Sequence, residues 1–499
     1  MTQNIAIVGS GFLGMTLALR LAESGAKVTL FESAGQIGGL ASTWQIGDFE
    51  WDKHYHVTLA SDSYTRKIVE QLGLGDEFNW VETKTGFYTD GKLYSMSDTM
   101  EFLKFPPLGI ISKLRLGATI FYASRLKNWK ALEKIPVEKW LTKLSGKRTF
   151  EKIWKPLLIA KLGDAYKKTS AAFIWSTIQR MYAARNSGLK KEMFGYVHGG
   201  YARVLKRFSQ VLIEKGVEIR LNSRIDRIEE FGNGNLRVIP AASRRRGDPK
   251  VKVLEQKMAT GQPAKYARVQ TAVSIAPGFS GMFLSEPTSL DGIFSDVRYR
   301  QATEVFDRVI MTCPSNTAAK LLPQLEKSEK RKLENIQCQG IICASVLMKC
   351  SLSDYYVTNI TDEAPFTGVI EMSALVDKKE FGRNALIYLP KYVAPNDEMF
   401  KKSDKDIKQI FLDSLERMYP HFRQKDVLAF KVSRVRQVFP LPVLNYSSDL
   451  PDMKTSIDGV YVVNSSHIVN GTLNVNETIH LAERFLADAF GKEKENQQG

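Results

Sequence analysis

Close to its N-terminus the chain reads Asn4-Ile5-Ala6-Ile7-Val8-Gly9-Ser10-Gly11-Phe12-Leu13-Gly14, a short apolar run followed at once by a G-x-G-x-x-G motif. An Ala- and Leu-rich segment of helical spacing continues to Glu23, and Gly25 ends it. Residues 27–31 then have the composition of a second strand, and Glu32 stands at its end. This order predicts a βαβ unit that binds a dinucleotide.

The three glycines of this motif and the carboxylate after it each have a separate physical task. Gly9 permits the tight turn, Gly11 lets a pyrophosphate approach the backbone, and Gly14 lets the helix pack closely on the strand. The N-terminus of the helix offers N–H groups and a positive dipole end to the phosphates. Glu32 can accept hydrogen bonds from both hydroxyls of an adenosine ribose. A lone motif of this kind also occurs as a structural turn, but the strands and carboxylate around it favour dinucleotide binding.

A second pair of glycines, Gly38-Gly39, follows six residues after Glu32. Glu32 with this pair resembles the extended fingerprint of the FAD-binding amine oxidase superfamily, which includes protoporphyrinogen oxidases, phytoene-desaturase-type enzymes and UDP-galactopyranose mutases. The segment 47–56 resembles the Asp-x-Gly-x-His element that these proteins carry beside the flavin. Asp52 and His56 match that element, whereas His54 stands where glycine is usual.

The resemblance implies an α/β fold in which a discontinuous, Rossmann-like FAD-binding domain carries an inserted α+β substrate domain. We expect residues 1–85, 190–315 and 445–499 in the FAD-binding domain, residues 86–189 and 316–444 in the substrate domain, and an insertion at 241–300. The insertion is rich in Gly, Pro, Ser and charge, and a lid, a partner contact and a disordered excursion all remain open for it.

The resemblance also implies noncovalently bound FAD, since no cysteine lies in the C-terminal loop. That loop departs from the superfamily in having Asn464-Ser465 where Gly-Asp is usual, and Asn474 with Glu477 predicts a capped helix after it. The expected cofactor-binding residues are Gly9, Ser10, Gly11, Phe12, Leu13, Gly14, Glu32, Gly38, Gly39, Leu40, Ala41, Ser42, Ile225, Thr312, Asn464, Ser465, Leu473 and Asn474.

The function that follows from the resemblance is that of an FAD-dependent oxidoreductase, which takes a hydride or two electrons from an organic substrate onto flavin N5. His56 is the expected catalytic residue, positioning or deprotonating the substrate, although a histidine there can equally be structural. Two alternatives stay open: a non-redox, mutase-like flavoenzyme that acts on a nucleotide- or lipid-linked sugar, and a non-catalytic FAD-binding scaffold.

The 499 residues carry a formal net charge of +16. An excess of positive charge favours an anionic membrane surface or a phosphorylated substrate as partner, or else forms only a solvated surface. Nucleic acid is disfavoured because no binding module is recognised. The six histidines and four cysteines show no metal-ligand spacing, so we expect no metal. The chain begins without a secretory signal and has no apolar run long enough to span a bilayer, which predicts a cytoplasmic protein. The oligomeric state stays open.

Residues 101–131 are apolar, aromatic and studded with Lys and Arg, and their helix is expected to begin after Pro107. Such a helix either lies on a membrane surface or faces the core with a solvated basic side, and the second reading is commoner. Asp90-Gly91 between alternating apolar residues predicts a hairpin turn. Strands are expected within 341–389 and a helix over 404–419.

Overall fold

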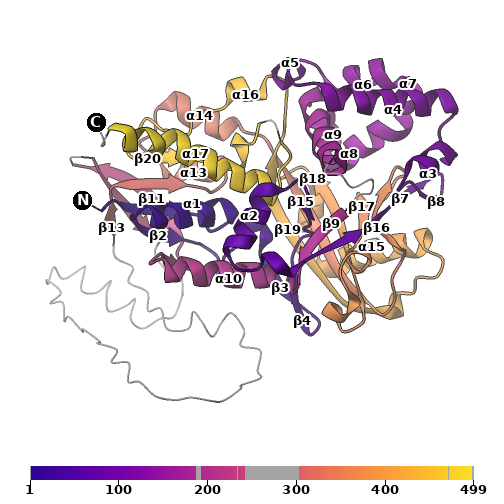
Figure 1. The fold of residues 1–499 in the computed structure, drawn as a ribbon, viewed down its shortest axis with the longest axis horizontal. Coiled ribbons are helices and arrows are strands. Elements are labelled where there is room, and N and C mark those ends of the chain that lie inside the picture. The colour runs from indigo at the N-terminus through magenta and orange to yellow at the C-terminus, as the bar shows by residue number, and fades with distance from the viewer. Residues whose placement is uncertain (1, 187–192, 233, 242–302, 470, 497–499) are drawn as a thin grey trace.

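The computed structural model describes residues 2–186, 193–232, 234–241, 303–469 and 471–496. Two parts lie side by side (Figure 1), each built around its own β-sheet. The insertion predicted over 241–300 lies outside the described residues, apart from Ala241. The limits predicted for the two domains stay predictions.

The first part contains a five-stranded parallel sheet. In spatial order its strands are β10 (Glu218–Arg220), β2 (Lys27–Phe31), β1 (Asn4–Val8), β14 (Arg308–Met311) and β20 (Val460–Val462). One face packs against α1 (Phe12–Glu23), α2 (Ser63–Gln71), α10 (Gly200–Glu214) and α17 (Val475–Asn496). The other face packs against the antiparallel strands β11 (Ile225–Phe231), β12 (Asn235–Pro240) and β13 (Glu304–Phe306), with α13 (Ser315–Leu321) and α14 (Lys327–Asn335). The expected β1–α1–β2 order is confirmed.

The apolar composition of β1 is explained by its central position. Ile5, Ala6 and Ile7 have no exposed surface, and Ile7 lies between Leu30 of β2 and Ile310 of β14. A parallel strand covered on both faces needs an unbroken apolar run rather than alternation, which is the pattern that the sequence shows. The G-x-G-x-x-G turn therefore follows the central, buried strand of the sheet.

The second part is built on a seven-stranded mixed sheet. Its order is β19 (Val427–Pro440), β15 (Cys338–Met348), β18 (Ala385–Val393), β17 (Gly368–Glu371), β16 (Tyr355–Ile360), β7 (Lys84–Thr89) and β8 (Lys92–Ser95). Only β16 and β7 pair in parallel within it. The predicted hairpin joins β7 and β8, with φ of 54° at Asp90 and 70° at Gly91. The expected helix α15 (Asp404–Met418) covers one face and begins with a capping box at Ser403.

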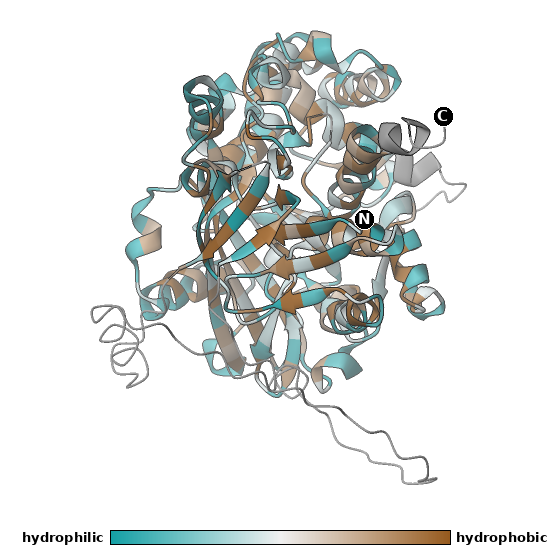
Figure 2. Cartoon of the chain, turned by 90° about the vertical axis from the view of Figure 1, so that its left-hand side faces the viewer, coloured by the Kyte–Doolittle hydropathy of each residue, from teal (hydrophilic) through white to brown (hydrophobic). Residues whose placement is uncertain are grey.

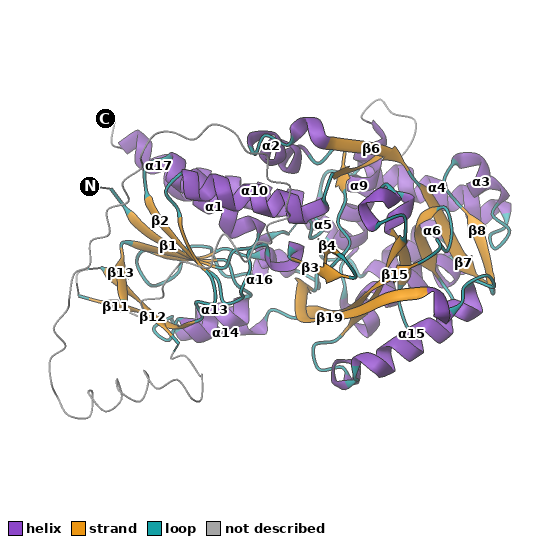
Figure 3. Ribbon diagram, turned by 90° about the horizontal axis from the view of Figure 1, so that it is seen from below, coloured by secondary structure: helices purple, strands orange, loops and turns teal. Residues whose placement is uncertain are grey.

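Helices from the segment between β8 and β9 cover the other face of this sheet, as Figures 1 and 3 show. They are α3 (Thr99–Lys104), α4 (Ile110–Arg125), α5 (Trp129–Leu132), α6 (Val137–Ser145), α7 (Lys147–Thr149), α8 (Lys155–Leu162) and α9 (Ala171–Asn186). The helix expected within residues 101–131 is confirmed, because α4 begins at Ile110, after Pro107. Figure 2 shows hydrophobic residues along the strands and on helices that pack against them.

Short strands link the two parts. These are β3 (Thr43–Ile46) with β4 (Phe49–Asp52), and β9 (Met193–Val197) between β5 (Thr58–Leu59) and β6 (Phe78–Glu82). Met193–Val197 forms a strand because β5 and β6 are available as partners. Strand formation here depends on pairing with distant residues, which local sequence does not reveal.

Helix α4 packs one side on the core, as the preferred interpretation expects, but its outer side differs from that interpretation. Its buried side includes Leu116, Ala123 and the lysine Lys113, whose Nζ donates to the carbonyl of Leu103 over 2.6 Å. Its outer side carries exposed apolar side chains at Ile110 (61%), Ile111 (73%), Leu114 (64%), Phe121 (54%) and Tyr122 (48%). Arg115 and Arg125 are exposed as expected, so the outer side is apolar as well as basic. In the part of the chain that the structure describes, no helix combines the length and apolarity needed to cross a bilayer.

Candidate functional site

A cavity of about 1680 Å³ lies between the two parts. One half is lined by the turn after β1, the end of β2 and the loop around Gly38, and the other by α8, α9 and strands of the seven-stranded sheet. Small-molecule sites usually occupy about 300–1000 Å³. The cavity therefore has room for a large cofactor and a substrate together.

The three motif glycines have different surroundings. A Cβ on Gly14 would lie 1.9 Å from the carbonyl oxygen of Gly9, and one on Gly9, where φ is +114°, would lie 2.5 Å from Oγ1 of Thr312. A Cβ on Gly11 would meet no atom within 4 Å, and Gly11 lines the cavity. No side chain caps α1 at Gly11. The open side of this turn therefore presents the backbone N-terminus of a helix to the cavity, an arrangement that binds phosphate.

Gly38 and Gly39 bring a second loop against this turn. Their φ values are +107° and +57°, and the N–H of Gly38 donates to the carbonyl of Ser10 over 2.9 Å. A Cβ on Gly39 would lie 3.2 Å from the Cα of Gly11. The two glycine segments thus form one continuous backbone surface on the cavity wall.

Glu32 lies at the end of β2 with its carboxylate fully hydrogen-bonded within the protein. Oε2 accepts from the N–H of Ser10 (3.0 Å) and from its hydroxyl (2.8 Å). Oε1 accepts from the N–H of Ala34 (2.8 Å) and the hydroxyl of Ser33 (3.2 Å). A carboxylate offers about four lone-pair positions, so any further donor must replace one of these serine hydroxyls.

The distant cofactor candidates meet at the same half of the cavity. Oγ1 of Thr312 lies 3.1 Å from the carbonyl oxygen of Val8 and 3.0 Å from that of Gly9. Nδ2 of Asn464 donates to the carbonyl of Cys313 over 2.9 Å, which joins the ends of β14 and β20. Oδ1 of Asn474 accepts the N–H of Glu477 over 3.0 Å, so Asn474 caps α17 as the sequence predicts.

Most of the expected cofactor-binding residues therefore line one cavity. The lining residues are Gly9, Ser10, Gly11, Phe12, Leu13, Glu32, Gly38, Gly39, Leu40, Ala41, Ile225, Thr312, Asn464, Ser465, Leu473 and Asn474. Gly14 and Ser42 are not among them: Gly14 packs on the Gly9 carbonyl, and Ser42 is buried with its carbonyl accepting the N–H of Lys53. We leave these two out of the cofactor contacts.

His56, the expected catalytic residue, also lines the cavity. Nδ1 of His56 lies 3.5 Å from Oδ2 of Asp52, a buried carboxylate. This nitrogen is itself buried and makes no hydrogen bond with a described residue. The ring of His56 lies 4.9 Å from that of Tyr201 at 54°. A second cavity of about 20 Å³ borders both His56 and Asp52 and is large enough for one water molecule. A water there could join the imidazole to the carboxylate.

The sequence did not reveal that His54 holds the loop that contains Gly38 and Gly39 in place through the next residue, Leu40. Nδ1 of His54 lies 3.1 Å from the carbonyl of Leu40 and its Nε2 lies 3.1 Å from the hydroxyl of Ser433. Burial lowers the pKa of His54 to about 4, so the ring is neutral near pH 7. The Leu40 carbonyl can only accept, which fixes the proton on Nδ1. The departure from glycine at this position was the available signal.

Side chains in the other half of the cavity were also missed. Hydroxyl oxygens of Tyr55 and Tyr392 lie 3.0 Å apart, and burial raises the pKa of Tyr55 to about 12. Nζ of Lys161 lies 3.6 Å from the ring centre of Tyr392. Arg180 donates to Oδ2 of Asp62 over 2.9 Å. These side chains come from separate elements, and no local sequence pattern marks them.

The residues present fit FAD on two observations. The open position at Gly11 and the uncapped start of α1 suit a pyrophosphate, which a side chain at either place would exclude. The Glu32 carboxylate ends β2 beside this turn, where a ribose hydroxyl can replace a serine hydroxyl. Among the described residues, no group of three or more His, Cys, Asp or Glu side chains is placed to hold a metal ion.

A sequence profile described as "Flavin containing amine oxidoreductase" matches residues 14–248 and 292–475. Among curated proteins, the 15-cis-phytoene desaturase of Solanum lycopersicum is 24% identical over 259 residues, which cover 47% of this chain and 42% of that protein. The zeta-carotene desaturase of Synechocystis sp. is 24% identical over 205 residues, 36% of this chain and 42% of that protein. The aligned segments thus span less than half the length of these two relatives.

Solved structures share the fold over nearly the full chain. A triple mutant of putrescine oxidase with redesigned cofactor binding superimposes with a TM-score of 0.69 at 15% identity, covering 98% of this chain and 99% of that one. A provisionally assigned protoporphyrinogen oxidase of Exiguobacterium sp. 255-15 gives 0.68 at 15% identity, with 98% of both chains covered. These superpositions establish a common fold of mixed α/β type. At 15% identity they show the fold alone, so the reaction must be argued from the site.

Proposed function

Because the chain belongs to the flavin-containing amine oxidoreductase family, we propose that it is an FAD-dependent oxidoreductase that removes a hydride or two electrons from an organic small molecule. The observation that carries this proposal is the single cavity in which a dinucleotide-binding turn and a largely apolar chamber meet. Flavin bound there would supply the two-electron chemistry, accepting the hydride at N5. The protein's own residues hold the cofactor and orient the substrate.

In the proposed complex, the N–H groups at the start of α1 bind the pyrophosphate where Gly11 leaves room. Glu32 binds the adenosine ribose after the hydroxyl of Ser10 or Ser33 turns away, because all its lone-pair positions are already used. The capped N-terminus of α17 at Asn474 offers a positive dipole end to the flavin edge that gains negative charge on reduction.

We assign His56 the handling of the substrate proton. The carboxylate of Asp52 lies nearest to Nδ1, which favours the proton on that nitrogen and leaves Nε2 as an acceptor. The distance of 3.5 Å and the adjoining water-sized cavity suit a bridging water rather than a direct hydrogen bond. His56→Gln should retain FAD and lower the rate of substrate reduction of flavin by about 10²–10⁴-fold, the usual contribution of a general base.

The first experiment is a visible spectrum of the purified protein, followed by anaerobic dithionite and then air. Flavin bands that bleach and return support the oxidoreductase proposal. Turnover that needs reduced flavin but consumes no acceptor would favour a mutase-like enzyme, and bound flavin that mild reductants leave oxidised would favour a scaffold. A colourless protein that cannot be reconstituted with FAD would refute the proposal.

We further propose that the outer side of α3 and α4 contacts an anionic membrane surface, from which an apolar or lipid-linked substrate reaches the cavity. Of the twelve large hydrophobic side chains exposed in the described residues, seven lie between Met100 and Tyr122. Residues 102–132 contain six Lys and Arg, five of them exposed and Lys113 buried, and no Asp or Glu. An exposed apolar strip rimmed by basic residues has the composition of an interfacial helix. Helix α4 packs on α9, which lines the cavity.

Flotation with vesicles tests this contact. Ile111→Glu adds charge at a site that is 73% exposed, so it should leave folding intact and reduce binding to vesicles of phosphatidylcholine with phosphatidylglycerol. Ile213→Glu, on the exposed side of α10, is the matched control and should bind as the wild type does. Equal binding of both variants, or no loss of wild-type binding at high salt, would contradict the membrane proposal.

A further inference from the structure

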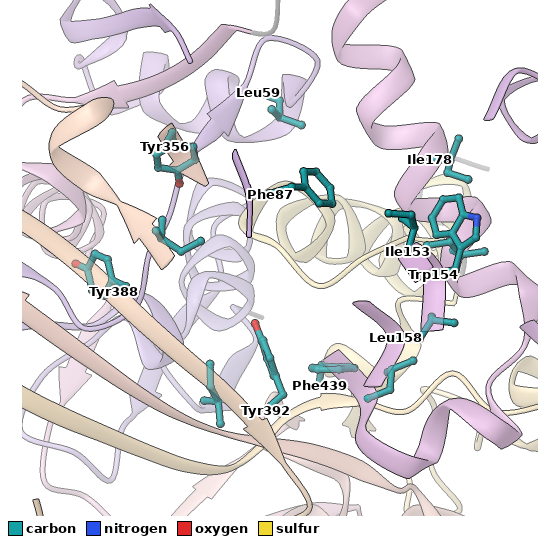
Figure 4. Packing of buried hydrophobic residues seen from close by; sticks show 14 of the residues in the cluster. Leu59, Phe87, Ile153, Trp154, Leu158, Ile178, Tyr356, Tyr388, Tyr392 and Phe439 are labelled. Carbon is teal, nitrogen blue, oxygen red and sulfur yellow. The ribbon is translucent and has the colours of Figure 1, made fainter. Parts of the chain in front are cut away.

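A lysine inside the cavity has aromatic rings for neighbours instead of a counterion. Lys161 lies in the last turn of α8, and its Nζ is 3.6 Å from the ring centre of Tyr392 and 5.2 Å from that of Phe439. The two rings meet edge to face, with centroids 5.9 Å apart. Figure 4 shows the side chains of Tyr392 and Phe439 next to each other. All three residues line the cavity.

The other charged side chains of this half of the cavity have polar partners. They are Arg180, which donates to Asp62, and Glu133, whose carboxylate accepts from the N–H and hydroxyl of Ser447. The structure gives Nζ of Lys161 no hydrogen bond or ion pair with a described residue. Burial alone lowers the pKa of Lys161 to about 7, and no carboxylate opposes this effect.

Other lysines of this segment behave as surface residues usually do. Lys155, six residues earlier on α8, forms an ion pair with Glu151 over 2.7 Å, and Lys152 pairs with Asp90. Lys161 thus differs from its neighbours in position and in lacking a partner. An ammonium group held among aromatic rings gains only part of the energy lost on leaving water. It would be stabilised by an anion that enters the cavity.

The rest of the chamber suits an apolar body. Its lining includes Trp154, Leu157, Leu158, Phe173 and Ile341, which belong to or pack against one buried hydrophobic cluster. Because Arg180 is paired with Asp62, Lys161 is left to orient an amphiphile by its charged end in a largely apolar wall. The same positive group disfavours a cationic amine, because two ammonium groups repel in a cavity with few counterions.

We infer that Lys161 forms the binding site for an anionic oxygen group, a carboxylate or phosphate, on an otherwise apolar substrate. This inference rests on the proposed function, since it assumes that the chamber beyond the flavin site receives the substrate. It names the substrate class as an anionic amphiphile and gives Lys161 a specificity-determining role. The ammonium pairs with the anionic oxygens while the Tyr392 and Phe439 rings cover its other side.

Binding of C12 probes to the FAD-loaded protein at pH 6.5 tests the inference. Dodecyl phosphate, dodecanoate, dodecanol and dodecylamine have the same chain and differ in the end group, and their binding can be followed by tryptophan fluorescence, since Trp154 lines the cavity. We expect at least one of the two anions to bind ten-fold or more tightly than dodecanol, and dodecylamine to bind no better than dodecanol. The ratio between the two anions shows whether phosphate or carboxylate is preferred.

Variants separate this role from a structural one. Lys161→Met should remove the preference for the anion while keeping affinity for dodecanol, and Lys161→Arg should keep the preference. Lys155→Met, on the same helix but paired with Glu151 at the surface, should behave as wild type. A preference that survives in Lys161→Met, or wild-type protein that favours dodecylamine, would overturn the inference. The flavin spectrum of the same samples separates the two proposals. Failure to bind FAD refutes the proposed oxidoreductase function. An intact flavin spectrum without a preference for the anions refutes only the proposed role of Lys161.

Discussion

Gly14→Ala and Gly11→Ala should affect different properties of the protein. The first should lower the stability of the apo protein, and the second should lower the affinity for FAD. In Gly14→Ala the new methyl would lie 1.9 Å from the carbonyl oxygen of Gly9, at least 1 Å closer than Cβ atoms come in real structures. Helix α1 must then move away from β1. Overpacking of this kind costs about 1–3 kcal/mol of folding free energy. The apo protein should therefore melt several degrees below wild type.

In Gly11→Ala the new methyl meets no protein atom within 4 Å and projects into the cavity. Gly11 has a φ of −66°, which alanine adopts without strain. Two small effects oppose each other: alanine is a poorer N-cap, by about 0.5–1 kcal/mol, and it lowers the entropy of the unfolded chain by a similar amount. The apo protein should melt within a degree or two of wild type.

The affinity for FAD, in contrast to the stability of the apo protein, should fall strongly in Gly11→Ala. The methyl on Gly11 displaces the pyrophosphate from the N–H groups of α1, and loss of one hydrogen bond to a charged group costs about 1.5–3 kcal/mol, a ten- to 150-fold rise in Kd. Differential scanning fluorimetry of apo protein with a fluorescence titration of FAD measures both quantities. An unstable Gly11→Ala apo protein, or one that binds FAD as wild type does, would refute the assignment of this turn as the phosphate site.

Three further perturbations follow from the hydrogen bonds at the site. Glu32→Ala should raise the Kd for FAD about ten- to 100-fold in the same titration, through loss of the ribose contact; an unchanged Kd would place the ribose elsewhere. Asn474→Ala should cost about 0.5–2 kcal/mol of stability in urea unfolding, by uncapping α17; no change would mean that the cap is redundant. For His54, the pKa in the folded protein is about 4, below the value of 6.5 in the unfolded chain. The unfolded chain therefore binds the extra proton, and the stability of the fold falls as the pH drops from 6.5 to 4. His54→Asn should make this decline in melting temperature less steep, and an equally steep decline would contradict the reasoning.

Structural features that depend on neighbouring residues in the sequence were predictable. The β1–α1–β2 unit, the turn at Asp90 and Gly91, and the cap at Asn474 each depend on residues a few positions apart. Their local chemistry permits few alternatives, because positive φ, helix dipoles and caps act over one turn. Most of the residues named from the sequence as cofactor contacts therefore line one cavity, whereas the approach of Thr312 to Gly9 was not predicted.

Features that depend on distant partners were not predictable. Met193–Val197 becomes a strand only because β5 and β6 flank it, and Lys113 is buried only because α3 ends where its ammonium can reach the Leu103 carbonyl. Lys161 lies in a helix of ordinary composition, and its position against Tyr392 requires a strand more than 200 residues away. Tertiary neighbours, rather than propensity, set these environments.

The order of strands in the parallel sheet has a consequence for synthesis of the protein. Strand β1 leaves the ribosome long before β14, yet one of its edges pairs with that strand, some 300 residues later: Ile5 lies opposite Arg308. Translation at about 5–20 residues per second leaves that edge without its partner for roughly 15–60 seconds. An apolar, unpaired strand edge is a site of aggregation during this interval. Yield of soluble protein should therefore depend on the rate of translation and on chaperones that shield the nascent first half, more than on the stability of the finished sheet.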